Sequence, residues 1–268
     1  MTRILAFLNQ SSTIPSGNET VQTFETLQFK NVSFTYPETN IEALSNLNLE
    51  IHKGKTVAFI GHTGSGKSSI VQLLMKASMP TSGAISMNGI DIAQLGTNTY
   101  RSLMGIVPQD VFLFSDTIEN NIRFGNGNAT LNEITRAAQT ADLHENILGF
   151  EEKYETLLGE RGINLSGGQN QRLSIARAII SNPEILLLDD CLSAVDTQTD
   201  EKIMRGLKKI REGKTNIIVS HRISSVHHAD KIFVLQQGQL AESGTHEELL
   251  AHKGLYFELV ELQKIQEN

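Results

Sequence analysis

Cysteine is almost absent from this sequence, which has a single one, Cys191, among 268 residues. One cysteine excludes a disulfide framework and a zinc site built from cysteines, and it is typical of a reducing compartment. Positive charge is also scarce, because 23 Lys and Arg stand against 30 Asp and Glu, for a net charge of −7. That balance argues against general nucleic-acid binding, which depends on clustered cations that neutralise phosphates.

Long apolar runs are missing as well. No stretch approaches the ~20 apolar residues of a membrane-spanning helix, and the first residues have too short an apolar part, and no small-residue cleavage site, for a signal peptide. Residues 1–24 are interpreted as a lead-in: positions 5–8 suggest the end of a helix, and positions 10–18 form a polar linker. We expect a junction with a preceding domain there, followed by one domain over residues 25–268.

Three short apolar runs predict the core of the fold. Residues 56–60, 185–189 and 216–220 are continuously apolar over most of their length, as in strands that are buried on both faces. The first run is followed by a glycine-rich turn and a helical pattern over residues 66–77, and the other two are preceded by helical patterns. This alternation predicts a parallel α/β core.

Other patterns flank that core. From Leu27 to Ile51, apolar and polar residues alternate around a one-residue slip, which predicts strands with a bulge. Residues 117–149 are mainly helical in pattern, so we expect an inserted helical subdomain at about 110–180. Residues 231–235 and 239–242 flank a Gln-Gln-Gly turn and predict a hairpin, and Thr245 with Glu248 has the spacing of a capping box.

The segment Gly61-His-Thr-Gly-Ser-Gly-Lys-Ser68 matches the phosphate-loop pattern G-x-x-x-x-G-K-[ST] between a buried strand and a helix. Its glycines let backbone N–H groups surround phosphates, and the helix N-terminus favours negative charge. Lys67 is expected to reach the β- and γ-phosphates, and the Ser68 hydroxyl to ligate Mg²⁺. The further expected nucleotide contacts are Gly61, Thr63, Gly64, Ser65, Gly66 and Ser69.

A phosphate loop also needs a carboxylate at the end of a neighbouring buried strand to hold Mg²⁺. Asp189, after Ile185-Leu-Leu-Leu, is in that position. An Asp that merely ends a core strand is the plainer alternative for this residue alone. Together with the phosphate loop, Asp189 is interpreted as the Walker B carboxylate of a P-loop NTPase.

Leu165-Ser-Gly-Gly-Gln169 resembles the signature sequence of ABC ATPases. Ser166 and Gln169 also have capping-box spacing. However, Gly167 and Gly168 in a first helical turn cost about 1 kcal/mol each relative to Ala, which favours a phosphate approaching the backbone. The resemblance covers about residues 27–250, and it implies an RecA-like parallel core with an N-terminal antiparallel β subdomain and an inserted α-helical subdomain.

Further elements of the family follow in its order. Tyr36 resembles the aromatic residue that stacks on adenine, and Gln109 the glutamine that senses Mg²⁺ and the membrane domain. Ser193-Ala-Val-Asp196 is similar to the D-loop, which crosses the dimer interface, and His221 to the switch histidine at the γ-phosphate. Taken singly, each has a structural explanation, such as a core tyrosine or a helix cap.

Two segments resemble exporters rather than importers. Gly159-Glu-Arg-Gly162 is similar to the exporter segment that contacts the coupling helices of the membrane domain, although a solvated charged loop is the alternative. The residues from Asp110 to Ile122 are similar to exporter sequence after the Q-loop. The resemblance therefore implies a transmembrane domain, fused or separate, and a location at the cytoplasmic face of the cell membrane.

The sequence departs from the family at Asp190, where efficient ATPases of this family have Glu. Asp and Glu have similar pKa values, but Asp is shorter by one methylene, roughly 1.5 Å. A general base must come within hydrogen-bond distance of the attacking water. We therefore predict ATP binding with slow hydrolysis, with Asp190, His221 and Gln109 as the catalytic residues.

An intact signature beside a weakened catalytic carboxylate suggests a division of labour. The resemblance implies a head-to-tail dimer around ATP and Mg²⁺, and Asp190 favours a non-identical partner, as in heterodimeric multidrug exporters. The alternatives are a non-transport ABC ATPase that acts on DNA or ribosomes, and a regulatory module that holds ATP. The first would carry a coiled-coil insertion, a second cassette or a basic face, and the sequence has none of these.

Overall fold

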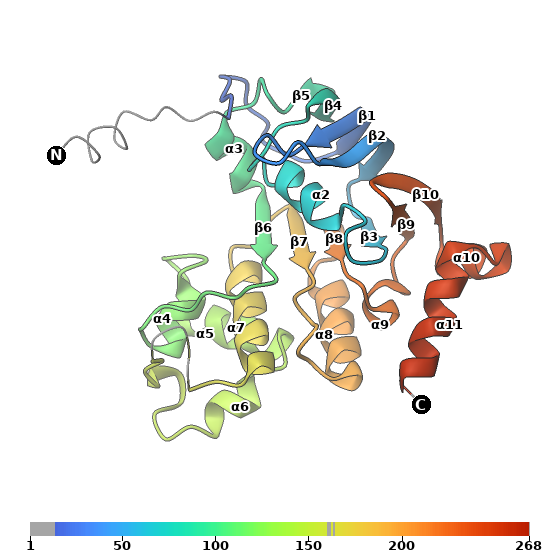
Figure 1. The fold of residues 1–268 in the computed structure, drawn as a ribbon. Helices are drawn as coiled ribbons and strands as arrows, with labels where there is room; N and C mark the ends of the chain where they lie inside the picture. The colour runs from blue at the N-terminus through green and yellow to red at the C-terminus, as the bar shows by residue number, and fades with distance from the viewer. Residues whose placement is uncertain (1–13, 160–161, 163, 268) are drawn as a thin grey trace.

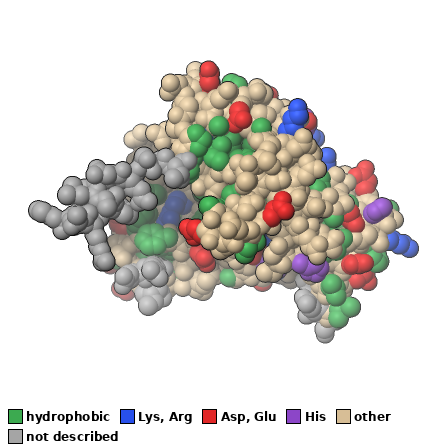
Figure 2. All heavy atoms as spheres, turned by 45° about the horizontal axis from the view of Figure 1, so that its top comes forward, with side chains coloured by type: hydrophobic (Ala, Val, Ile, Leu, Met, Phe, Trp, Pro, Cys, Tyr) green, Lys and Arg blue, Asp and Glu red, His purple; other side chains and the backbone are tan. Residues whose placement is uncertain are grey.

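The computed structural model describes residues 14–159, 162 and 164–267, and the helix end predicted at positions 5–8 lies outside them. The described chain forms two sheets and a group of helices beside them (Figure 1). Within those residues, no helix is both long and apolar enough to cross a lipid bilayer. Figure 2 shows one face of the molecule, where acidic and basic side chains are scattered.

The first sheet is antiparallel and has the strand order β2-β1-β4-β5. Buried and exposed residues alternate along much of β1 and β2, as expected for strands with one buried face. The register between β1 and β2 shifts between Phe29 and Val32, which confirms the predicted bulge. These strands are β1 Thr26–Thr35, β2 Glu42–His52, β4 Ser82–Met87 and β5 Ile90–Asp91.

The second sheet has the order β10-β9-β3-β8-β7-β6. Neighbouring strands from β9 to β6 are parallel, and β10 pairs antiparallel with β9 in the predicted hairpin. Almost every residue of β3, β7 and β8 is buried, which explains their continuous apolar runs. These strands are β3 Thr56–Ile60, β6 Met104–Val107, β7 Ile185–Asp189, β8 Thr215–Val219, β9 Lys231–Gln236 and β10 Gln239–Gly244.

Helices cover both faces of the second sheet. The buried side chains of α2 share one core cluster with strands of both sheets, so α2 joins the β subdomain to the core. Four helices, α4 to α7, gather beside the sheet at the lower left of Figure 1, where α4 and α5 pack on α7. The helices are α2 Lys67–Leu74, α3 Thr97–Ser102, α4 Ile118–Arg123, α5 Leu131–Thr140, α6 His144–Leu148, α7 Gly167–Ile179, α8 Thr197–Ile210, α9 Ile223–Val226, α10 His246–His252 and α11 Leu255–Glu267.

This arrangement confirms the predicted fold class, a P-loop α/β core with an antiparallel β subdomain and a helical insertion. The segment before β1 packs on the β subdomain. Val21 and Phe24 are buried in its core, and Glu19 forms a bridge with Leu95. The packed part of the chain therefore starts before residue 25.

Candidate functional site

The phosphate loop connects β3 with α2, at the carboxyl end of a buried parallel strand. Gly66, the N-cap of α2, has a φ of 104°, in the left-handed region that glycine adopts without strain. A Cβ on Gly66 would also lie 2.7 Å from the carbonyl oxygen of Ala43. Both the backbone conformation and the close approach of β2 therefore require glycine at this position.

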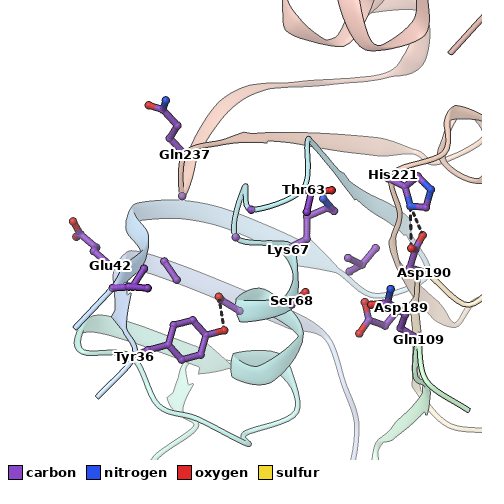
Figure 3. A pocket seen from close by; sticks show the side chains of 17 residues that line it. Tyr36, Glu42, Thr63, Lys67, Ser68, Gln109, Asp189, Asp190, His221 and Gln237 are labelled. Atoms are coloured by element: carbon purple, nitrogen blue, oxygen red, sulfur yellow. Dashed lines mark hydrogen bonds and ion pairs between the residues drawn. The ribbon is translucent and has the colours of Figure 1, made fainter. Parts of the chain in front are cut away.

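Lys67 is the cation of this loop. Its ammonium group donates hydrogen bonds to the carbonyl oxygens of Gly61, at 2.7 Å, and His62, at 3.0 Å. Burial lowers the pKa of Lys67, while the carboxylates of Asp190 and Asp189 act in the opposite direction. The side chain thus lies folded over the loop, facing the space that phosphates would occupy (Figure 3).

A cleft of 520 Å³ opens over the loop. It collects predicted residues from five separate stretches of the sequence. Gly61 and Ser65 do not line it. The Ser65 side chain is buried, and its hydroxyl has no hydrogen-bond partner among the described residues. The predicted residues that line the cleft are Tyr36, Thr63, Gly64, Gly66, Lys67, Ser68, Ser69, Gln109, Asp189, Asp190 and His221.

Glu42 and Gln237 also line the cleft, and sequence reasoning missed both. Glu42 begins β2, and Gln237 lies in the turn between β9 and β10, where its φ is 48°. The predicted hairpin places Gln237 in a turn. However, nothing in the local sequence pattern relates that turn to the phosphate loop. The two are joined by a hydrogen bond from the backbone N–H of Gly238 to the carbonyl oxygen of Ser65, at 3.1 Å.

Tyr36 lies at one end of the cleft, away from Asp189 and Asp190 (Figure 3). Its ring packs edge-on against Phe34, with centroids 4.9 Å apart, and its hydroxyl lies 3.0 Å from the Ser69 hydroxyl. These contacts fix the plane of the ring at the mouth of the cleft. A flat aromatic group could stack on it.

The carboxylate of Asp189 ends β7 at the opposite side of the cleft. Burial, and then the neighbouring Asp190 charge, raise the pKa of Asp189 to about 6. A carboxyl group with a raised pKa and little compensating charge suits a bound cation. Ser68, Gln109 and Asp189 line the same cleft and offer the hard oxygen donors that Mg²⁺ prefers. Among the described residues, no three His, Cys, Asp or Glu side chains form a metal cluster.

Asp190 adopts a φ of 45°, and its backbone N–H donates to the carbonyl oxygen of Val219 at 2.7 Å. Its carboxylate lies 2.9 Å from His221 Nδ1 and 3.3 Å from the Ser220 hydroxyl. The predicted base and the predicted switch histidine are therefore in direct contact. Cys191, next in the chain, is buried, and burial raises the pKa of its thiol, so it remains protonated.

The predicted signature lies in a different cleft, of 330 Å³, which contains Ser166, Gly167 and Gly168. Ser166 is the N-cap of α7, and it forms a complete capping box with Gln169, whose side chain faces the cap rather than the cleft lining. Among the described residues, none lines both this cleft and the one over the phosphate loop.

The two signature glycines differ in their surroundings. A Cβ on Gly168 would lie 3.0 Å from the carbonyl oxygen of Ala194, whereas among the described residues a Cβ on Gly167 would meet only the Ala194 methyl, at 3.6 Å. Close packing within the chain therefore explains Gly168. It does not explain Gly167, whose missing side chain leaves the backbone open to the cleft.

The D-loop segment packs directly on the signature helix. The amide of Gln171 accepts from the backbone N–H of Ala194 at 3.0 Å and donates to the Ser193 hydroxyl at 3.1 Å. Asp196 caps α8 by accepting from the backbone N–H of Thr199. A shift of either the signature helix or the D-loop would therefore disturb the other.

An apolar surface follows Gln109 in the chain. Phe112 and Phe124 are 55% and 66% exposed, and Phe114 packs between them. Beneath these rings, Arg177 of α7 donates to the carbonyl oxygens of Phe112 and Asn121, at 2.7 and 2.8 Å. Of the predicted exporter segment at 159–162, Glu160 and Arg161 lie outside the described residues.

Comparison with known proteins shows which family and which individual proteins this chain is similar to. Residues 44–193 match the ABC transporter family. The chain is 46% identical over 241 residues to human "ATP-binding cassette sub-family B member 5", covering 90% of this chain and 19% of that protein. It is 44% identical over 237 residues to "Probable multidrug resistance ABC transporter ATP-binding/permease protein YheI" of Bacillus subtilis (strain 168), covering 88% of this chain and 40% of that protein.

A solved structure is similar over nearly the whole chain. It is described as "Structure of a bacterial Atm1-family ABC exporter with ATP bound". The TM-score is 0.94 at 38% sequence identity, and the match covers 98% of this chain and 47% of that one. The present chain thus spans less than half of the length of each of these relatives.

Proposed function

Because the chain belongs to the ABC transporter family, we propose that it is the ATP-binding domain of an exporter and dimerises around ATP to drive a membrane domain. The convergence of Tyr36, Lys67, Asp189 and His221 on one cleft, with the signature in a second cleft, supports this proposal most directly. Family membership alone would not assign these individual residues.

ATP would lie along the larger cleft, with adenine at Tyr36 and phosphates over the loop. On binding, the Lys67 ammonium would exchange its two carbonyl partners for oxygens of the β- and γ-phosphates. Ser68, Gln109 and Asp189 would hold Mg²⁺, which neutralises charge on the phosphates when bound. The N-terminus of α2 would add its backbone N–H groups.

The signature cleft would act on the nucleotide of a second subunit. In a head-to-tail pair, Ser166 and the open backbone at Gly167 would approach the phosphates held by the partner's loop. The separation of the two clefts within one chain favours this arrangement, because the signature residues do not line the cleft that holds the phosphate loop.

We propose slow hydrolysis at the chain's own site. The reaction forms a bond from a water oxygen to the γ-phosphorus, breaks the bond from that phosphorus to the β–γ bridging oxygen, and passes a water proton to the base. Asp190 is roughly 1.5 Å shorter than Glu. Its carboxylate already contacts His221 and Ser220, so it has little freedom to move toward the water.

A partner with Glu after its Walker B Asp and an altered signature would complement this chain. The partner's ATP site would be completed by the intact signature of this chain, Ser166–Gln169, and that site would carry most of the ATP turnover. The chain would then contribute a binding site that holds the dimer together. This division of labour favours a heterodimer over a homodimer.

The apolar surface of Phe112, Phe114 and Phe124 suits the membrane domain as a partner. It follows Gln109 directly, and it is fastened to the signature helix by Arg177. Docking there would couple the membrane domain to both clefts. The domain would thereby be held at the cytoplasmic face of the membrane.

Sedimentation of the purified chain tests the proposal. We expect a monomer with ADP and a dimer with ATP at high protein concentration, and a monomer in both for Lys67→Met. Mixing with an ABC domain that has the complementary features should raise turnover well above that of either chain alone. The proposal would be contradicted if the native chain bound neither nucleotide, or if its association state were the same with ATP as with ADP.

A further inference from the structure

The switch histidine lies on an exposed segment between β8 and α9. The His221 side chain is 54% exposed, and its contact with Asp190 fixes only the imidazole. The position of its backbone depends on other parts of the chain. Three side chains hold the segment that runs from His221 to Val226: Arg222 lies within the segment, and Asp200 and Gln263 come from distant parts of the chain.

Two of these side chains connect the segment to the D-loop and to α8. Arg222 donates to the carbonyl oxygens of Leu192 and Val195, both at 2.8 Å. The buried carboxylate of Asp200, on α8, accepts hydrogen bonds from the hydroxyls of Ser224, at 3.1 Å, and Ser225, at 2.7 Å. These bonds attach α9 to the D-loop and α8.

The third side chain comes from the C-terminal helix α11. The Gln263 carboxamide accepts from the backbone N–H of Ile223 at 2.9 Å and donates to the carbonyl oxygen of His221. One side chain thus satisfies a donor and an acceptor on the two sides of Arg222.

α11 is a firm support for that amide. The Glu242 carboxylate accepts from the backbone N–H groups of Leu255, at 2.6 Å, and Tyr256, at 3.2 Å, at the start of the helix. Tyr256, Leu259 and Val260 are buried in the core. Gln263 lies about 12 Å further along, at 1.5 Å per residue, so the anchored helix carries the amide to the switch segment.

We propose that Gln263 is a positioning residue that holds the His221 backbone where the imidazole can meet the γ-phosphate of ATP. Through it, the C-terminal helix becomes part of the nucleotide switch. The inference rests on the proposed function, because it requires ATP in the cleft beside His221. Gln263 should therefore affect the affinity for ATP and leave the affinity for ADP unchanged, since ADP has no γ-phosphate.

The test compares Gln263→Met, which keeps the length of the side chain, with Glu258→Gln, an exposed change on the same helix. Nucleotide affinities of the full chain and thermal unfolding are measured for each. In Gln263→Met, we expect ATP affinity to fall about five-fold, the size of one net neutral hydrogen bond, with ADP affinity unchanged, and we expect the loss of both hydrogen bonds to lower Tm. Glu258→Gln should match the native chain throughout. Gln263→Glu keeps the acceptor for the Ile223 N–H and loses the donor to the His221 carbonyl oxygen. Its ATP affinity should therefore lie between those of Gln263→Met and the native chain.

Equal ATP affinity in Gln263→Met and the native chain would overturn the inference. So would an equal loss of affinity for ATP and ADP, because that would indicate a merely structural contact. Failure of the native chain to bind ATP at all would instead refute the proposed function.

Discussion

The two signature glycines allow a phosphate-binding role to be separated from a packing role. Gly167→Ala adds a methyl group that, in the part of the chain that the structure describes, meets only the Ala194 side chain, at 3.6 Å. Alanine is favoured over glycine in a helix by up to about 1 kcal/mol. The isolated domain should therefore keep or slightly gain stability. If Gly167 is open so that a phosphate of the partner's nucleotide can approach, the same methyl group should weaken ATP-dependent association.

Gly168→Ala is the matched control, one residue along the same helical turn. Its methyl carbon would lie 3.0 Å from the carbonyl oxygen of Ala194, so the D-loop or α7 must shift. Overpacking of this kind costs about 1–3 kcal/mol, which offsets the helical gain. We expect the free energy of unfolding of Gly168→Ala to lie about 2 kcal/mol below that of Gly167→Ala.

Urea unfolding followed by circular dichroism measures the first difference, and sedimentation with ATP measures the second. We expect the dimer of Gly167→Ala to dissociate at least about tenfold more readily than the native dimer, a loss of about 1.4 kcal/mol. The reasoning fails if Gly167→Ala unfolds as easily as Gly168→Ala. It also fails if Gly167→Ala is stable and associates with the ATP dependence of the native chain.

Three further predictions concern single side chains. Lys67→Met should lower ATP affinity by about 10- to 100-fold, the value of a charged hydrogen bond of 1.5–3 kcal/mol, while Tm stays near the native value; an unchanged affinity in a nucleotide titration would count against the phosphate role. Tyr36→Ala should lose about 1–3 kcal/mol of binding to ATP through stacking, whereas Tyr36→Phe should lose little; equal losses would assign the effect to the hydroxyl at Ser69 instead. Burial raises the pKa of Asp200 in the folded chain. The folded state therefore favours the neutral carboxyl, and the free energy of unfolding falls as pH rises from the unfolded-state pKa through the raised one. The Tm of Asp200→Asn relative to native should therefore increase from pH 4 upward, and a difference that does not vary with pH would refute the assignment.

Much of the fold could be predicted from the sequence because its core strands are buried on both faces. Residues 56–60 and 185–189 are strands at the bounds expected from their apolar runs. The slip in alternation before Val32 is a true register shift, and Thr245 with Glu248 forms the expected capping box. Each of these patterns is local, so a short window of sequence contains the physical cause.

The arrangement of the site was harder to predict, since it depends on contacts between distant segments. The approach of Gly238 to the loop at Ser65 and the bonds from Gln263 to the switch segment join residues far apart in the chain. The separate reasons for Gly167 and Gly168 also depend on the position of Ala194, which the signature sequence alone does not contain.

The central claim is that the cleft binds ATP but hydrolyses it slowly because Asp190 is too short to reach the attacking water. The most direct measurement is steady-state ATP hydrolysis at high protein concentration for the native chain and for Asp190→Glu. We expect little turnover in the native chain and a clear rise in the variant, with similar ATP affinity in both. Comparable and robust turnover in the two proteins would contradict it and indicate an ordinary homodimeric ATPase.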